Sequence, residues 1–259
     1  MDLGISGRKA IVCASSRGLG RACAFALAQA GCEVVVNGRD DKTLAATAEE
    51  LRLSTDANVT AVVADVATAE GQAALLDACP EPDILVNNNA GPPFRDFREL
   101  TRAQMIDGVT ANMVVAIELT QKVIDSMCAK NFGRIVNITS GSVKMPLSGL
   151  DLSSGARAGL TAFLAGVARS VAGSNVTINF LLPGAFDTER LASNVAMGAK
   201  KRGISIEQAR KERMASVPAK RFGTPAEFGD ACAFLCSAQA GYITGQSLLI
   251  DGGIYPGVL

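Results

Sequence analysis

One segment in the second half of the chain gathers side chains that can bind or carry protons. They are Ser140, Lys144, Asp151, Ser153 and Arg157. The chain has no histidine, the side chain most often used for proton transfer near neutral pH. Any acid or base must therefore be a carboxyl, a lysine, a tyrosine, a cysteine or a hydroxyl.

Ser153 and Arg157 are spaced by one helical turn, so their side chains can meet if the segment is helical. An unperturbed serine hydroxyl is a much weaker acid than a tyrosine, whose pKa is about 10. Arginine keeps its proton because its pKa exceeds about 12, although its charge can bind ribose hydroxyls or an oxyanion. We expect a site that keeps a positive charge but lacks a simple proton relay.

Lys144 and Asp151 are two possible substitutes for the missing proton donor. A partly desolvated lysine can titrate nearer neutrality, and a carboxyl two residues before Ser153 can act as an acid or base if its pKa rises. The alternative for each is an ordinary loop residue. The only tyrosines, Tyr242 and Tyr255, both lie near the C-terminus, and we expect a structural role for Tyr242.

The elements that must position these residues alternate along the chain. Apolar runs of strand length occur at Ala10 to Cys13, Val34 to Val36, Val59 to Val63, Ile84 to Val86, Ile135 to Ile138, Ile178 to Leu182 and Leu248 to Ile250. Helix-length segments lie between them at Arg21 to Ala30, Lys42 to Leu53, Met105 to Met127, Ala156 to Ala172 and Ala226 to Cys236. Continuous hydrophobicity is typical of strands covered on both faces. The pattern predicts an α/β fold, a single domain over residues 1–259 with a doubly wound parallel sheet.

An insertion over residues 184–224 follows the sixth predicted strand. Ligands of such sheets bind beyond the carboxyl ends of the strands, so we expect this insertion to cover a substrate. It carries many lysines and arginines and few acids. These bases indicate either an anionic substrate or a solvated helix face.

Composition excludes several classes of function. The formal net charge is zero, which gives no support for nucleic-acid or membrane binding. No export segment precedes Gly4, and no apolar run approaches the roughly 18 residues that span a bilayer, so we expect a cytoplasmic protein. The seven cysteines form no CxxC pair, and we expect reduced thiols and no metal site.

A glycine-containing loop connects the first strand to the first helix. Glycines there let the backbone approach a pyrophosphate, whose charge the helix N-terminus favours. The loop comprises Ala14, Ser15, Ser16, Arg17, Gly18, Leu19 and Gly20.

The loop resembles the Gly-x-x-x-Gly-x-Gly motif of the short-chain dehydrogenase/reductase family, with Ala14 in place of the first glycine. Further motifs of that family are matched in order over roughly residues 8 to 254. They are Asp65-Val66, Asn88-Asn89-Ala90-Gly91, Asn112, Pro183-Gly184 with Thr188, Gly245-Gln246 and Asp251-Gly252-Gly253. The resemblance implies a Rossmann fold whose loops bind a nicotinamide cofactor, with the glycine loop, Asp65, Val66, Asn88, Ala90, Gly91, Pro183, Gly184 and Thr188 as contacts.

The resemblance also places the catalytic centre. Ser140 matches the family's serine and Asn112 its asparagine, whereas Ser153 and Arg157 stand where the family has its tyrosine and lysine. Two features fix the alignment of this segment with the family's motif. They are the spacing from Ser140 and the Arg157-Ala-Gly-Leu160 sequence, which is similar to the family's Lys-Ala-Ala/Gly-Leu. The family's proton relay is therefore altered.

The residues after the second strand indicate which cofactor is bound. An acid there would bind the ribose 2′-hydroxyl, but the sequence is Asn37, Gly38 and Arg39, followed by Asp40. Arg39 and Arg17 can pair with a 2′-phosphate. We predict NADP(H) rather than NAD(H).

Three functions are compatible with the sequence. The first is an NADP(H)-dependent carbonyl/alcohol oxidoreductase, similar to a 3-oxoacyl reductase, with a rebuilt proton path around Ser140, Ser153 and Arg157. The others are a non-redox lyase on the same fold and a catalytically silent NADP(H)-binding protein. We also expect a homotetramer, with the helices Met105 to Met127 and Ala156 to Ala172 at one interface.

Overall fold

The computed structural model describes residues 2–257, whose strands form one parallel sheet in the order β3-β2-β1-β4-β5-β6-β7. The strands are β1 (Lys9–Val12), β2 (Glu33–Gly38), β3 (Val59–Val63), β4 (Ile84–Asn87), β5 (Gly133–Ile138), β6 (Val176–Pro183) and β7 (Ser247–Ile250). Every predicted strand is present, with its ends within two residues of the prediction. The strand order reverses direction between β1 and β4, where α/β sheets bind their ligands.

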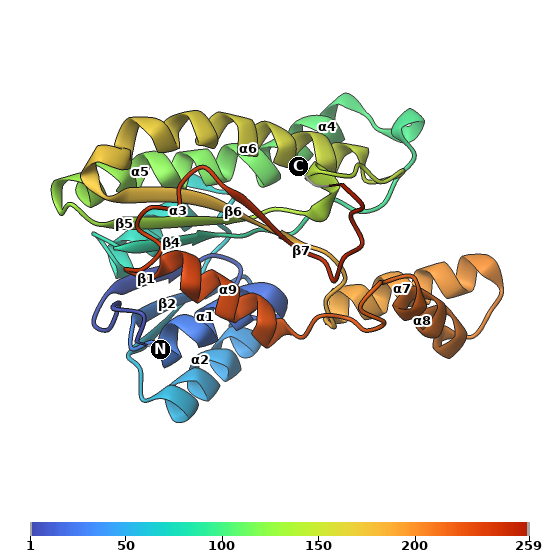
Figure 1. The fold of residues 1–259 in the computed structure, drawn as a ribbon, viewed down its shortest axis with the longest axis horizontal. Coiled ribbons are helices and arrows are strands. Elements are labelled where there is room, and N and C mark those ends of the chain that lie inside the picture. Colours follow the sequence, from blue (N-terminus) through green and yellow to red (C-terminus); the bar gives the residue numbers. More distant parts are fainter. Residues whose placement is uncertain (1, 258–259) are drawn as a thin grey trace.

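Helices cover both faces of the sheet (Figure 1). One face packs against α1 (Gly18–Gln29), α2 (Asp41–Thr55) and α9 (Pro225–Cys236). The other packs against α3 (Ala69–Ala78), α5 (Val115–Ala129) and α6 (Asp151–Val171). Neighbouring residues of one strand enter opposite cores, as Val12 and Ile11 do. This two-sided burial explains the continuous hydrophobicity of the strands and confirms the doubly wound fold.

The helix predicted over Met105 to Met127 is divided in the structure. It consists of α4 (Arg102–Val109), a π-helical turn η2 (Thr110–Val114) and α5. Asn112 lies in that turn, and its side-chain amide donates a hydrogen bond to the Gly108 carbonyl at 3.1 Å. A π turn inside a helix frequently marks a functional site, because it moves one side chain out of the regular spacing.

The helix predicted from Ala156 begins earlier, at Asp151. Ser153 and Arg157 are therefore on one helix, as their spacing predicted. Asp151, for which an ordinary loop position was the alternative to a catalytic role, is the first residue of α6.

The segment after β6 is helical rather than irregular. It contains α7 (Glu189–Arg202) and α8 (Ile206–Ala215), which pack on each other through Val195, Ala199 and Ala209. Figure 1 shows these two helices projecting from the body of the molecule as an arm. The arm begins at the carboxyl end of β6 and so stands beside the edge of the sheet where ligands bind.

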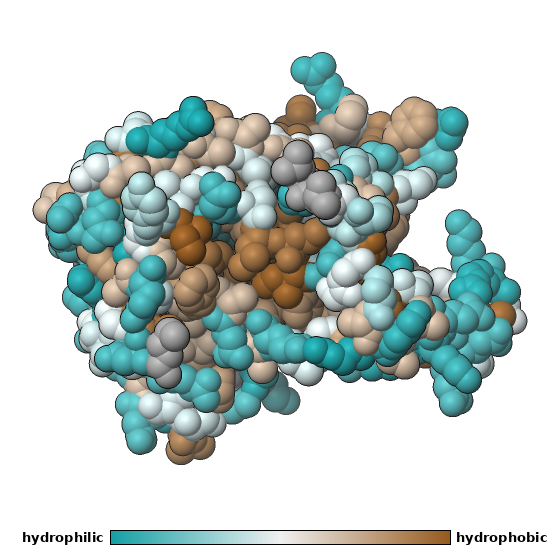
Figure 2. All heavy atoms as spheres, in the orientation of Figure 1, coloured by the Kyte–Doolittle hydropathy of each residue, from teal (hydrophilic) through white to brown (hydrophobic). Residues whose placement is uncertain are grey.

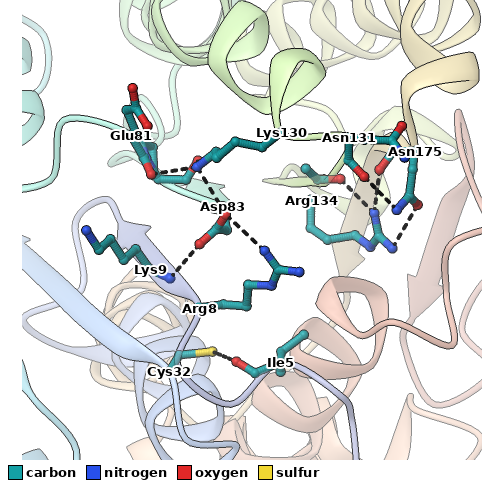
Figure 3. A network of polar contacts seen from close by, with 12 residues as sticks. Ile5, Arg8, Lys9, Cys32, Glu81, Asp83, Lys130, Asn131, Arg134 and Asn175 are labelled. Carbon is teal, nitrogen blue, oxygen red and sulfur yellow. Dashed lines mark hydrogen bonds and ion pairs between the residues drawn. The ribbon is translucent and has the colours of Figure 1, made fainter.

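A polar network holds together the opposite end of the sheet, where the strands begin (Figure 3). Asp83 accepts hydrogen bonds from the Lys9 backbone N–H at 3.0 Å and pairs with Lys130 at 3.0 Å. Arg134 is 1% exposed and donates to the carbonyls of Ser237 and Asn175. All of these contacts lie at the amino ends of β1, β4 and β5. These ends therefore stabilise the fold, and the carboxyl ends of the strands are left for chemistry.

The cysteine prediction is confirmed for the thiols. All seven are free, and six of them are buried. Over residues 2–257, the structure contains no helix that is both long and apolar enough to cross a membrane.

Candidate active site

A cleft of about 700 Å³ opens at the carboxyl ends of the strands. It joins the glycine loop to the start of α6 and to the arm. Most of the predicted site residues line it, namely Ala14, Ser16, Arg17, Gly18, Leu19, Arg39, Asp65, Val66, Asn88, Ala90, Ser140, Ser153, Arg157, Pro183, Gly184 and Thr188. The structure therefore brings the predicted cofactor and catalytic positions into one space.

The glycine loop has the geometry of a phosphate cradle. A Cβ on Gly18 would meet nothing within 4 Å, so this position faces open space, and its φ is +60°. A Cβ on Gly20 would lie 2.4 Å from the Ala14 carbonyl oxygen, so the helix and the loop pack too closely for any side chain. The α1 N-terminus has no side-chain cap, which leaves its first N–H groups available to an anion.

Ala14 occupies the left-handed region with φ 44°, a conformation that costs an alanine more than a glycine. Its N–H donates to the Asn37 side-chain oxygen at 3.1 Å. Ser15 points inward: it is fully buried, donates to the Val12 carbonyl at 2.7 Å and accepts from the Asn37 N–H at 2.9 Å. Ser15 thus ties the loop to β1 and β2 and does not line the cleft.

Two arginines and three acids line the end of the cleft beyond β2. Arg39 pairs with Asp65 at 3.5 Å, and Arg17 pairs with Glu189 at 3.3 Å, both with exposed guanidinium groups. Asp40 is engaged as the cap of α2, where hydrogen bonds from the Thr43 hydroxyl and backbone N–H lower its pKa. Two exposed arginines with only surface pairs can turn toward a phosphate at little cost.

The wall between the cofactor end and the catalytic end is built from the turn after β4. Asn88 donates to the Ala14 carbonyl at 3.0 Å and so ties this turn to the glycine loop. Asn89 donates to the Ala111 carbonyl at 3.2 Å and ties it to the π turn. These two amides fix Ala90 and Gly91 between the cofactor end and the catalytic end of the cleft.

Ser153 and Arg157 form a buried pair on α6. The guanidinium Nε donates to Ser153 Oγ at 3.3 Å, and Nη1 donates to the Ile138 carbonyl at 2.7 Å. The side chains are held against the end of β5, beside Ser140, whose hydroxyl accepts from the Ser142 N–H at 3.1 Å. Three polar groups thus converge where the family resemblance places the reacting carbonyl.

Arg157 carries its charge without an acidic partner. Burial, and then the nearby positive charge of Arg190, lower its pKa to about 10. A Cβ on Gly91 would lie 2.9 Å from Arg190 Nη2 and 3.5 Å from Arg157 Nη2. None of the ion pairs within residues 2–257 includes either guanidinium. Two like charges that converge in this way favour an anion between them.

Asn112 lies behind this pair. It is 5% exposed, and its side-chain oxygen has no hydrogen-bond partner. With Asn88, Asn89 and Arg157 it lines a small pocket of about 20 Å³. A pocket of this size has room for one water beside the unpaired Asn112 oxygen.

Lys144 and Asp151 lie apart from Ser153. Asp151 is exposed and accepts a hydrogen bond from the Gly149 N–H at 3.1 Å, so its carboxylate is used at the start of α6. The Lys144 ammonium is 5.8 Å from the centre of the Tyr255 ring. Neither residue is among those that line the cleft.

Two residues of the cleft were missed by sequence reasoning. Arg190 stands two positions after Thr188, a family position, so its proximity could have been inferred. Tyr255 reaches the cleft because the segment after β7 returns past Gly184, and no local sequence signal predicts that path.

Comparisons with known proteins agree with this geometry. A family model described as "Enoyl-(Acyl carrier protein) reductase" matches residues 13–255. The chain is 30% identical to 3-oxoacyl-[acyl-carrier-protein] reductase FabG of Vibrio harveyi, covering 98% of this chain and 99% of that protein. It is 30% identical to the NADPH-dependent reductase BacG of Bacillus subtilis, covering 96% and 98%. The crystal structure of L-sorbose reductase from Gluconobacter frateurii, complexed with NADPH and L-sorbose, superposes with a TM-score of 0.94 at 28% identity, with full coverage of both chains.

Proposed function

Because this chain is an oxidoreductase that belongs to the short-chain dehydrogenase/reductase family, we propose that it reduces a small carbonyl compound with NADPH. The observation that carries the proposal is the single cleft that joins an open glycine cradle to the Ser140, Ser153 and Arg157 cluster. The same site can also oxidise the corresponding alcohol with NADP⁺.

The residues present fit a phosphorylated dinucleotide. Gly18 offers an open backbone at the uncapped end of α1, which suits a pyrophosphate. Arg17 and Arg39 suit a 2′-phosphate. The structural relative with L-sorbose bound also holds NADPH, and the BacG relative is described as NADPH-dependent. When bound, the cofactor supplies the hydride.

The catalytic cluster polarises the carbonyl. The Ser140 and Ser153 hydroxyls are placed to donate hydrogen bonds to the carbonyl oxygen, because Ser153 Oγ accepts from Arg157 and keeps its own proton for another partner. The fixed charge of Arg157 stabilises the negative charge that develops on this oxygen. The protein thus orients the carbonyl and stabilises the oxyanion, which are functions that Arg157 performs without losing its proton.

The substrate class follows from the unpaired charges. Arg157 and Arg190 meet at Gly91, and Arg213 of α8 also lines the cleft. We propose that the substrate carries a carboxylate or a comparable anion, and that the arm over residues 184–224 closes on it. Arg190 is the residue that would link the bound anion to α7.

An absorbance assay tests this function. NADPH oxidation is followed with ketones and 3-oxoacyl thioesters, each ketone supplied as a carboxylate and as its neutral amide. The carboxylate series should be reduced with the lower KM, and Arg190→Gln should raise that KM while leaving the amide series unchanged. NADPH binding without turnover of any compound would instead indicate a silent binding protein. Product formation without NADPH loss would indicate a lyase.

We also propose that the chain assembles as a homotetramer. The helices predicted at an interface expose apolar side chains, with Ile106 of α4 53% exposed and Phe163 of α6 48% exposed. A second set consists of Phe234 on α9 and Leu248 on β7, an edge strand. Figure 2 shows apolar side chains gathered in the middle of the face where β7 lies. Two such surfaces on one chain suit two different symmetry axes.

A further inference from the structure

A tyrosine from the far end of the chain lies in the cleft. The chain has two tyrosines. Tyr242 is 103% exposed, whereas Tyr255 lines the same cleft as Ser140 and Ser153. The phenol that is missing from α6 is therefore present in the cleft on another segment.

A lysine accompanies this tyrosine. The Lys144 ammonium lies 5.8 Å from the centre of the Tyr255 ring, within the range of a cation–π contact. Ser140 is the N-cap and Lys144 the C-cap of the short 3-10 helix η3 (Gly141–Val143). Ser140 and Tyr255 thus place a hydroxyl and a phenol in the cleft, and the Lys144 ammonium lies beside the Tyr255 ring without lining the cleft itself.

The segment after β7 is anchored, so the position of Tyr255 is defined. The Asp251 carboxylate accepts from the N–H groups of Gly253 and Tyr255, each at 2.8 Å. A Cβ on Gly184 would lie 2.5 Å from Asp251 Cβ, so the segment passes directly against the end of β6. Ile254 packs beside Val217, next to the arm.

The other candidates for the proton donor are less suited. Asp151 is at the surface, where its carboxylate accepts a hydrogen bond from the Gly149 N–H. Burial raises the pKa of the Cys13 thiol to about 12, so this cysteine beside the glycine loop is not an acid at neutral pH. The Lys144 ammonium is 5.8 Å from the centre of the Tyr255 ring. The charged groups that line the same cleft are Arg17, Arg39, Asp40, Asp65, Arg157, Glu189, Arg190, Arg213 and Asp251.

We propose that Tyr255 is the catalytic acid and that Lys144 is the cation that assists it, so that a phenol and an ammonium from two distant segments replace the missing pair on α6. This inference rests on the proposed carbonyl reduction. The carbonyl carbon would receive its new C–H bond from the hydride that bound NADPH supplies, and the π electrons of the carbonyl would move to its oxygen. That oxygen takes the proton of Tyr255, giving the alcohol, and the resulting phenolate regains a proton from water at the open side of the cleft.

Turnover of matched variants tests the proposal. With the best carbonyl substrate of the panel, Tyr255→Phe should lower kcat by about 10²- to 10⁴-fold, the usual contribution of a general acid. Tyr242→Phe is the control, since it removes the same hydroxyl from a fully exposed position, and it should leave kcat unchanged. Lys144→Met should displace the pH profile of kcat, which loss of a purely structural residue would not do. Wild-type kcat and an unchanged pH profile in Tyr255→Phe would overturn the proposal.

A second measurement does not depend on turnover. The chain has no tryptophan, so in Tyr242→Phe the near-ultraviolet tyrosinate band reports Tyr255 alone. Saturating NADP⁺ should alter its titration, and adding Lys144→Met should move ionisation to higher pH. If neither change affects the titration, Tyr255 is not the acid, whatever the turnover assays with the carbonyl substrates show. If the titration responds but wild type reduces no compound, the carbonyl reduction fails while the phenol–ammonium pair remains.

Discussion

Replacing Arg157 by methionine removes a buried charge that has no acidic partner. Burial and Arg190 lower the pKa of Arg157 from the ordinary arginine value to about 10. At 1.36 kcal/mol per pKa unit, this difference costs the folded state about 3 kcal/mol. Methionine fills similar space but leaves the Ile138 carbonyl and Ser153 Oγ without their donor, which costs about 2 kcal/mol. We therefore predict that Arg157→Met increases the free energy of unfolding by about 1 kcal/mol.

The sign of the pH dependence follows from the same shift. The folded protein releases the Arg157 proton at a lower pH than the unfolded chain does. Below a pH of about 10 both states are charged, so the full cost is present at neutral pH. As the pH rises above about 10, the unfolded state binds more protons than the folded state and the cost disappears. The substitution should therefore stabilise the protein at pH 7, where the measurement is made.

Urea unfolding at pH 7 without cofactor, followed by far-ultraviolet circular dichroism, measures the effect. Arg169→Met is the matched control, because Arg169 is an exposed residue of the same helix, and its change should stay within about 0.5 kcal/mol. An Arg157→Met protein that is less stable than wild type would refute the reasoning, since its hydrogen bonds would then outweigh the desolvated charge.

Three further results are expected. Arg39→Ala combined with Arg17→Ala should weaken NADPH binding by about tenfold or more and leave NADH binding unchanged; equal losses for both cofactors in a fluorescence titration would exclude a 2′-phosphate contact. Phe163→Glu should reduce the assembly mass in light scattering, because it places a charge on the exposed apolar face of α6, and an unchanged tetramer would exclude this interface. In the Tyr255→Phe background, the double change Ser153→Tyr with Arg157→Lys should raise kcat by about 10²-fold or more by restoring the family's acid, and no gain would show that α6 is not aligned with the substrate.

Much of the fold could be predicted from the sequence because burial on both faces leaves a continuous apolar signature in the inner strands β1, β2, β4, β5 and β6. Val34 to Val36 and Ile84 to Val86 are examples, since every residue in them is buried. The π turn at Asn112 could not be predicted, because a single extra residue in a helical turn does not alter the apolar pattern enough to reveal it. The start of α6 was also missed, since Leu150 provides no side-chain cap to mark it.

The residues of the site also fall into some that could be predicted from the sequence and some that could not. The glycine loop, Ser140, Ser153 and Arg157 are fixed by local spacing, so their convergence could be predicted before any coordinates. The meeting of Arg190 with Arg157 depends on how α7 leaves β6, and the place of Tyr255 depends on the path of the chain after β7. Such contacts join segments far apart in the sequence, and their residue types alone do not predict them.

Calorimetric titration of the wild-type protein tests the central claim most directly, namely that the cleft binds a phosphorylated nicotinamide dinucleotide beside Ser140. We predict a single site for NADPH per chain, with an affinity at least about tenfold higher than for NADH because two arginines meet the extra phosphate. The absence of heat with either reduced or oxidised cofactor at millimolar concentration would contradict the account, and the proposed redox function would fail with it.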